Sequence, residues 1–537
     1  MTKGNNLPTF SRNRLAALLL GASAVMPGFS QELPQRPQLV VGIVVEGLSD
    51  DYLELLRNHF GNNGFRRLSE NGITIRDLDF GTPLDGAAST ALLFTGASPA
   101  VNGIGASTVY NREVRRPRPV FNDEATIGNF TSETLSPAAL GASTISDEVR
   151  ISSGGLGYAY SIAANPSEAI IMAGHAGNSA FWINDLTGKW ATTTFYRDLP
   201  QKPQEINHRN PLENKLDTLQ WVPLLAIERY PDLPSYKKAY PFRHSFPRSD
   251  KNRIHAYKSS AAANTDIATM AIDYLRTMPL GKRNVTDMLS LSFTLAPYPY
   301  TRDADSRPEL MDSYLRLDRD LSRIFEAIDA SGPGMDKTLI FVTGTPLTRR
   351  QRRDDEKWAI PYGEFSSRKA VSLLNMYLMA IHGNGEWVSG YHNSQLYLNH
   401  KLIKDRGINL TDIRLEAARF LERMSGVSHA WSLDEILSRQ ASEKPDAFRR
   451  NTVQETSGDV VIAIAPGWQE IDDDSDTEAP VTVTRAVATT TPAFILAPQT
   501  PPRTIETPVD ARIIAPTVCR ILRIRSPNGA ALSPLRL

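Results

Sequence analysis

The sequence predicts an α/β fold, in which a mostly parallel sheet is flanked by helices and carries cap insertions. Three apolar runs, residues 39–48, 287–293 and 337–343, are each predicted to form a buried strand, and the first shows no alternation of apolar and polar residues. Runs of this kind are typical of central parallel strands that are buried on both faces. Helical patterns separate them, and strands that alternate with helices indicate a parallel or mixed sheet. The 537 residues are enough for one large domain with insertions.

The first of these runs, LVVGIVVEGL at 39–48, organises the prediction. Its β-branched residues favour a strand, and Glu46 stands near its end. Ser49 suits a helix N-cap, and Asp50 and Asp51 suit the first turn of a following helix. Open α/β sheets place their chemistry at the carboxyl ends of strands. We therefore expect Glu46 to mark the edge of the sheet where a site would form.

The other elements follow in chain order. Further predicted strands are 73–78, 158–163, 169–173, 459–464 and 493–497, and predicted helices lie within 81–96, 143–149, 260–278 and 310–328. The last helix is the clearest, because its apolar residues recur at three- and four-residue steps. Residues 190–255 are rich in Pro, Arg, His and aromatics, which indicates a first cap insertion outside the sheet. Residues 347–450 form a second insertion.

The N-terminus resembles a secretory signal peptide over residues 1–30. A basic region containing Arg12 and Arg14 precedes a short apolar core at 15–26, and Gly28 and Ser30 suit cleavage before Gln31. A membrane anchor is the alternative, but the core is short for a spanning helix. We therefore expect residues 31–537 to be exported, not membrane-spanning, and periplasmic or associated with an outer membrane.

Composition restricts the possible partners. The chain has 59 basic and 59 acidic residues, so its net charge is zero. General nucleic-acid binders are usually basic, and we expect no nucleic-acid partner. Cys519 is the single cysteine, which excludes an internal disulfide.

Eight sequence stretches occur in an order that is typical of one protein superfamily. They are RPQLVVGIVVEGL, GFRRLSENGI, LLFTGASPAVNGIGASTVYNRE, AGHAGNSAFWIND, YLRLDRDLSRIFEAID, KTLIFVTG, SQLYLNHKLI and SGDVVIAIAPGW. They span roughly residues 36 to 500. In this order they resemble the alkaline phosphatase superfamily, and most closely its bacterial branch related to type I phosphodiesterases and nucleotide pyrophosphatases. The resemblance implies a sheet between helices, with the two insertions forming a cap over the site.

The resemblance also implies two zinc ions, held by three aspartates and three histidines, and a Thr or Ser nucleophile. The matching positions carry other residues. The metal positions are Glu46, Pro297, Thr301, Thr345, Pro346 and Thr490, the nucleophile position is Gly86, and the substrate-holding positions are Ser107, Asn165 and Ser167. Proline offers no side-chain ligand, and glycine cannot act as a nucleophile.

These substitutions predict an exported pseudoenzyme without cofactor, with a structural role or an interaction role among envelope proteins. Two alternatives stay open. One is a phosphatase or phosphodiesterase with a displaced, metal-poor site that uses Glu46, Asp85, Asp303 and Asp305. The other is a module that binds a phosphorylated ligand, to which the arginine-rich run at 348–356 could contribute. In each case we expect Glu46, Gly86, Pro297 and Thr345 to converge at the carboxyl edge of one sheet.

Overall fold

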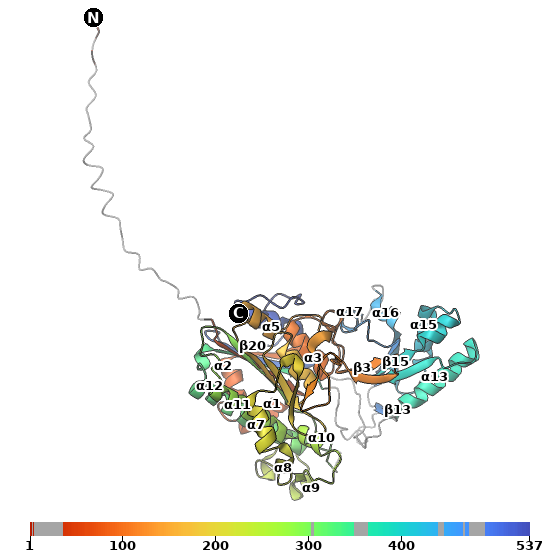
Figure 1. Cartoon of the computed structure of the whole chain (residues 1–537), viewed down its shortest axis with the longest axis horizontal. Helices are drawn as coiled ribbons and strands as arrows, with labels where there is room; N and C mark the ends of the chain where they lie inside the picture. The colour runs from red at the N-terminus through yellow and green to blue at the C-terminus, as the bar shows by residue number, and fades with distance from the viewer. Residues whose placement is uncertain are drawn as a thin grey trace. The chain divides into compact units, whose positions relative to one another are not determined.

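The computed structural model describes residues 36–301, 305–347, 363–438, 445–465, 468–471 and 489–536, together with Met1, Thr2 and Gly4. Residues 36–537 form one compact unit, drawn in Figure 1. Nearly all of the predicted signal peptide lies outside the described residues, so that prediction stays a prediction. Within the described ranges, no helix combines the length and the apolar character needed to cross a bilayer.

An eleven-stranded sheet forms the centre of this unit, with the order β20-β2-β19-β12-β1-β11-β6-β7-β8-β5 and β21 paired to β2. Its middle strands run parallel: β12 (Thr338–Thr345), β1 (Leu39–Glu46), β11 (Asp287–Thr294), β6 (Ala159–Ile162) and β7 (Ser179–Ile183). On one side, β19 (Thr490–Leu496) is antiparallel to both β12 and β2 (Ile73–Asp79). The predicted fold class is confirmed.

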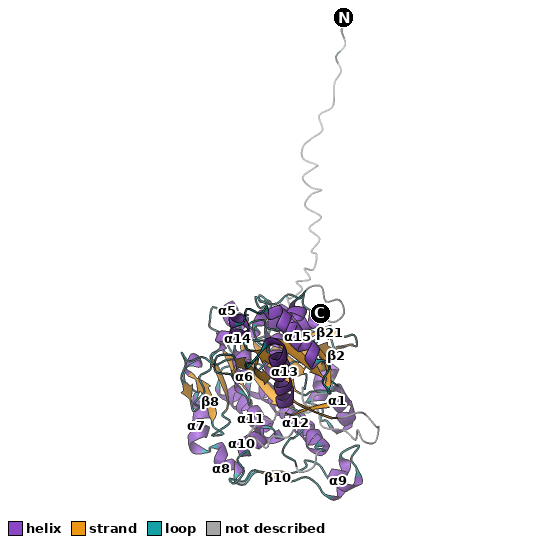
Figure 2. Ribbon diagram, turned by 90° about the vertical axis from the view of Figure 1, so that its right-hand side faces the viewer, coloured by secondary structure: helices purple, strands orange, loops and turns teal. Residues whose placement is uncertain are grey.

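Helices cover both faces of the sheet, and Figure 2 shows the strands between them. One face packs against α1 (Asp50–Leu56), α11 (Ala261–Thr277) and α12 (Arg307–Ser331). The other packs against α3 (Gly86–Thr95), α5 (Ile145–Ser152), α6 (Pro166–Ala173) and α18 (Ile514–Ile521). Within β1, Val41 and Ile43 belong to the first core and Val40 and Val44 to the second. Burial on both faces explains why the run shows no alternation.

The second insertion has a sheet and a core of its own. Its elements are β13 (Gly363–Ser366), α13 (Ser367–His382), β14 (Val388–His392), β15 (Gln395–Leu398), α14 (His400–Asp405), α15 (Leu410–Leu421), β16 (Val427–Ser432), α16 (Leu433–Leu437), α17 (Pro445–Arg450), β17 (Val460–Ile464) and β18 (Trp468–Ile471). Four strands form an antiparallel sheet in the order β14-β15-β17-β16. The element series continues past residue 450, the boundary expected from the sequence.

A β-hairpin that precedes the insertion in the chain contacts it. It consists of β3 (Thr108–Asn111) and β4 (Arg116–Pro119). Its Arg112 donates a 2.8 Å hydrogen bond to the buried Asp459, which also receives bonds from His400 at 2.7 Å and Arg414 at 2.8 Å. One buried carboxylate thus connects three segments that are distant in sequence.

Residues 169–173, predicted as a strand, belong instead to helix α6. A run of five apolar residues does not distinguish a buried strand from a buried helix. Pro166 at the first helical position and Glu168 in the first turn favour the helix. The first insertion also begins with a strand of the main sheet, because β8 (Trp190–Thr193) pairs with β7.

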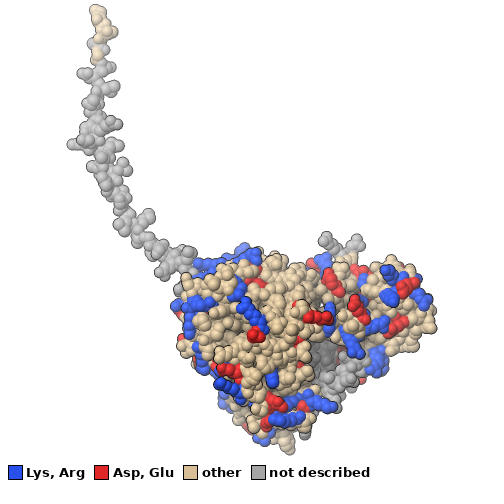
Figure 3. Space-filling model, viewed as in Figure 1, with Lys and Arg blue, Asp and Glu red and all other residues tan. Residues whose placement is uncertain are grey.

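The remaining elements are α2 (Phe65–Asn71), α4 (Pro99–Asn102), β5 (Gly128–Asn129), α7 (Gln201–Arg209), α8 (Leu212–Leu216), β9 (Gln220–Trp221), α9 (Ser235–Ala239), β10 (His244–Ser245), α10 (Arg253–Lys258), β20 (Arg503–Ile505) and β21 (Val509–Asp510). Figure 3 shows acidic and basic side chains interspersed over the face that it presents, in keeping with their equal numbers.

Candidate functional site

Three neighbouring parallel strands end in one row of polar residues. In the register of the sheet, Glu46 of β1 lies level with Thr294 of β11 and Thr345 of β12. Thr294 Oγ1 donates a 3.0 Å hydrogen bond to Glu46 Oε2. The buried Oγ1 of Thr345 has no hydrogen-bond partner among the described residues. This row forms one wall of the candidate site.

The N-termini of two helices face the same edge. Helix α3 begins at Gly86, and its N-cap Asp85 accepts hydrogen bonds from the backbone N–H groups of Ala88 at 2.8 Å and Ser107 at 2.5 Å. Helix α6 begins after Asn165 and carries Glu168 in its first turn. The positive ends of the helix dipoles favour carboxylates at these positions.

Three carboxyl groups gather around Gly86. A Cβ atom built on Gly86 would lie 3.0 Å from Glu168 Oε1 and 4.0 Å from Glu46 Oε1. Asp85 precedes Gly86 in the chain and is close enough to raise the pKa of Glu168. Glu46, Asp85 and Glu168 are called the carboxylate group below. Glu168 therefore occupies the space into which a side chain at position 86 would project.

Glu168 has a perturbed proton affinity. Burial raises the pKa of its carboxyl to about 7, and the negative charges of Glu46 and Asp85 add to the rise. The residue is partly exposed as a whole, but its Oε2 atom is buried and has no hydrogen-bond partner in the described part of the chain. Burial also raises the pKa of Asp85, against the effect of its bonds from Ala88 and Ser107. Near neutral pH, Glu168 can therefore both give and take a proton.

A family model described as type I phosphodiesterase / nucleotide pyrophosphatase matches residues 40–490. The chain belongs to this family. It is 25% identical to alkaline phosphatase PafA of Elizabethkingia meningoseptica, over 93% of this chain and 94% of that protein. It is 26% identical to alkaline phosphatase PhoV of Synechococcus elongatus, with 94% of each chain covered. A crystal structure of wild-type PafA superposes with a TM-score of 0.79 at 24% identity, covering 93% and 98% of the two chains.

These comparisons confirm the predicted resemblance and contradict the predicted function. The non-catalytic, structural or interaction role was inferred from the substituted positions alone. Relatives named as phosphatases span nearly the whole chain, and the family model describes phosphodiesterases. They favour the hydrolase alternative over a pseudoenzyme.

Most of the residues predicted to match the family's site lie at the edge described above. Thr345 is the last residue of β12, Pro346 follows it, and Thr490 is the first residue of the neighbouring β19. Pro297 and Thr301 lie in the loop after β11. Glu46, Gly86 and Thr345 therefore come together as expected, and Pro297 stands three residues beyond the neighbouring strand end. Ser107 contacts Asp85, and Asn165 and Ser167 stand at the start of α6 next to Glu168.

Two other predicted acids do not add to the carboxylate group as far as the structure describes them. Asp303 lies outside the described residues, as does the whole arginine-rich run at 348–356. Asp305 is held by the guanidinium of Arg307 at 2.7 Å, and although burial opposes it, these hydrogen bonds lower the pKa of Asp305. Asp305 is therefore engaged in an ion pair of its own.

The residues predicted to stand at the family's metal positions do not fit a two-zinc centre. Zinc sites use three or four Cys, His, Asp or Glu ligands. Pro297 and Pro346 offer no side-chain donor, and no group of three such ligands among the described residues could hold a metal ion. The histidine of the AGH stretch, His175, is instead bonded to Asp147 at 3.2 Å and to the Leu140 carbonyl at 3.0 Å. These two contacts connect the turn after α6 to α5 and to the backbone at Leu140.

Glu168 is the member of the carboxylate group that was not predicted from the sequence. It directly follows Ser167, which was predicted at a substrate-holding position, and directly precedes residues 169–173, which were predicted as a strand. The proline at position 166, followed by a glutamate two residues later, is the signal of a helix start that could have found it.

Proposed function

We propose that this protein is a phosphoric ester hydrolase that uses Glu168 as its acid–base group, in a metal-poor site formed with Glu46 and Asp85. Membership of a phosphodiesterase family supports the reaction class. The observation that carries the assignment of Glu168 is its position: a carboxyl with a pKa of about 7 lies where the side chain of a nucleophile at position 86 would project.

The proposed step is a displacement at phosphorus by water. Protonated Glu168 donates its proton to the oxygen of the leaving alcohol as the P–O bond breaks, and the bond from the water oxygen to phosphorus forms. The carboxylate then recovers a proton from the attacking water. A positioned acid of this kind contributes about 10²–10⁴-fold in rate. The N-termini of α3 and α6 offset part of the negative charge at this edge.

This proposal has a definite pH dependence. Three ionised carboxylates would repel a phosphate ester, and a proton on Glu168 removes one of these charges. We therefore expect hydrolysis to be fastest below pH 7 and to fall as the pH rises through about 7, the pKa of Glu168.

The test is an assay of p-nitrophenyl phosphate and bis(p-nitrophenyl) phosphate with the purified chain between pH 5 and 9, with EDTA and with added zinc. We expect activity that persists in EDTA and falls by about 100-fold or more in Glu168→Gln. Glu416→Gln is the matched control, because Glu416 is a partly exposed glutamate of the second insertion. Activity that requires zinc and survives Glu168→Gln would contradict the assignment of the residue. Absence of turnover in the unaltered chain would contradict the hydrolase itself.

Export to the periplasm or the outer membrane is part of the proposal and rests on the N-terminal sequence. Sequencing of the native protein should begin at or near Gln31. A chain that retains Met1 in the envelope fraction would contradict cleavage. Association with other envelope proteins stays a prediction.

A further inference from the structure

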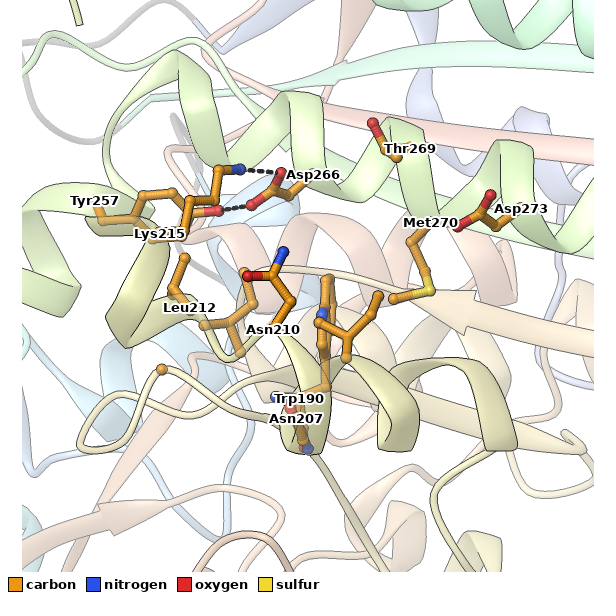
Figure 4. Close-up of a pocket in the computed structure, with 13 residues that line it drawn as sticks. Trp190, Asn207, Asn210, Leu212, Lys215, Tyr257, Asp266, Thr269, Met270 and Asp273 are labelled. Carbon is orange, nitrogen blue, oxygen red and sulfur yellow. Dashed lines mark hydrogen bonds and ion pairs between the residues drawn. The ribbon is translucent and has the colours of Figure 1, made fainter. Parts of the chain in front are cut away.

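A cavity of about 240 Å³ lies between α7, α8 and α11, outside the carboxylate group. Figure 4 shows the side chains that line it. Trp190, Ile206, Leu212 and Met270 supply an apolar wall, and Trp190 and Met270 are themselves almost fully buried. Such a lining with a few polar groups is typical of sites for small organic molecules.

One end of the cavity has its charges satisfied within the protein. The ammonium of Lys215 is paired with Asp266, and the hydroxyl of Tyr257 donates to the same carboxylate. Both contacts are drawn as dashed lines in Figure 4. Because Lys215 is neutralised by Asp266, this end provides no net positive charge for an anionic ligand.

The other end carries a second carboxylate. Asp273 lies on α11 seven residues beyond Asp266, about 10 Å along the helix axis. Its Oδ2 atom is 3.4 Å from the ammonium of Lys202, and both side chains are partly exposed. That separation is long compared with the 2.7–2.9 Å of a strong charge-assisted hydrogen bond. Asp273 therefore keeps acceptor capacity at the mouth of the apolar wall.

We propose that this cavity binds a small primary amine with an apolar body. The ammonium group pairs with Asp273 in place of Lys202, and the apolar body lies against Trp190 and Met270. The lining itself carries two carboxylates and a single lysine, and Lys202, which lies outside the lining, balances the second carboxylate until a ligand ammonium takes its place. Lys202 acts as an internal competitor of the ligand, since its ammonium occupies the same oxygen.

Binding of 2-phenylethylammonium chloride to the full chain tests the proposal, by calorimetry or by NMR, with neutral 2-phenylethanol as the uncharged analogue. Because a hydrogen bond to a charged group contributes more to binding than one between neutral groups, we expect the amine to bind at least about tenfold more tightly than the alcohol. Asp273→Asn should abolish this difference. Lys202→Ala should tighten amine binding by about two- to five-fold, the range of exposed ion pairs.

Asp273→Asn should weaken binding of the amine and Lys202→Ala should strengthen it. Loss of folding would weaken binding in both variants, so it cannot produce this pair of results. Asp434→Asn is the matched control, because Asp434 is a partly exposed and ion-paired aspartate in the second insertion. Equal binding of amine and alcohol would overturn the recognition of the ammonium group. If the amine does not bind at a concentration of about 10 mM, its dissociation constant is too high for a specific site, and the proposed site would be overturned.

Discussion

Replacing Glu168 with glutamine should increase the stability of the fold at alkaline pH while it removes the proposed catalytic group. The ordinary pKa of this carboxyl is 4.5, and in the folded protein it rises to about 7. The folded state keeps the proton after the unfolded chain has released it. Stability is therefore lost as the pH rises from 4.5 to about 7, and the loss is constant above that range.

The size of the effect follows from the shift. A difference of one pKa unit corresponds to about 1.4 kcal/mol, so the displacement of Glu168 costs the folded state up to about 3 kcal/mol at pH 8.5. Glutamine is nearly isosteric, carries no charge, and its amide can donate to the neighbouring carboxylates of Glu46 or Asp85. We expect Glu168→Gln to be about 1–3 kcal/mol more stable than the unaltered chain at pH 8.5 and equally stable at pH 4.5.

Urea unfolding at pH 4.5, 6, 7 and 8.5 measures this difference, with Glu416→Gln as the control for loss of a glutamate. The comparison of variant with unaltered chain at each pH cancels the titration of all other groups. A stability difference that stays constant over the whole pH range would refute the reasoning, because it would mean that Glu168 titrates normally. A gain in stability together with a loss of activity is the pattern expected of a carboxyl retained for function.

Three further predictions concern other contacts. Gly86→Ala should gain little stability in the unaltered chain, because the new Cβ would lie 3.0 Å from Glu168 Oε1. In a chain that also carries Glu168→Ala, the same change should raise the free energy of unfolding in urea by about 0.5–1 kcal/mol. Equal gains in the two backgrounds would exclude the contact. Asp459→Asn should cost about 3–5 kcal/mol and increase hydrogen exchange in the second insertion, because it removes the buried carboxylate that accepts hydrogen bonds from Arg112, His400 and Arg414. Hydrogen bonding to Asp147 raises the pKa of His175, so its contribution to stability should be complete below pH 6.5 and disappear as the pH rises through the raised value; NMR titration measures this, and an ordinary pKa would contradict it.

The central strands could be predicted from the sequence because strands buried on both faces appear there as continuous apolar runs. In β1, both faces of the strand contact a hydrophobic core, and the residues are apolar without alternation. The edge formed by Glu46 and Thr345 followed from the same prediction, since parallel strands end on the same side of a sheet. Element α6 could not be assigned in this way, because five buried apolar residues carry no period that separates helix from strand.

The composition of the carboxylate group was harder to predict than its location. Glu46 was identified from its position at a strand end, and Asp85 from its place beside Gly86, the predicted nucleophile position. The contact of Glu168 with the space beside Gly86 depends on how α3 packs against α6, two helices that no local pattern brings together. A close approach between side chains of separate elements is a property of the packed structure, and single-sequence patterns do not record it.

The neighbouring positions of β12 and β19 also bear on how this chain could have been assembled in evolution. The chain leaves the sheet after Thr345 and returns to it at Thr490 on the adjacent antiparallel strand, so 144 residues form one closed excursion. Closing an excursion of that length costs about 3 kcal/mol more in chain entropy than closing a four-residue turn. A modest entropic cost of this size allows a whole subdomain to be acquired or exchanged between two fixed strands. The scaffold and its cap could therefore have diverged at different rates within one gene.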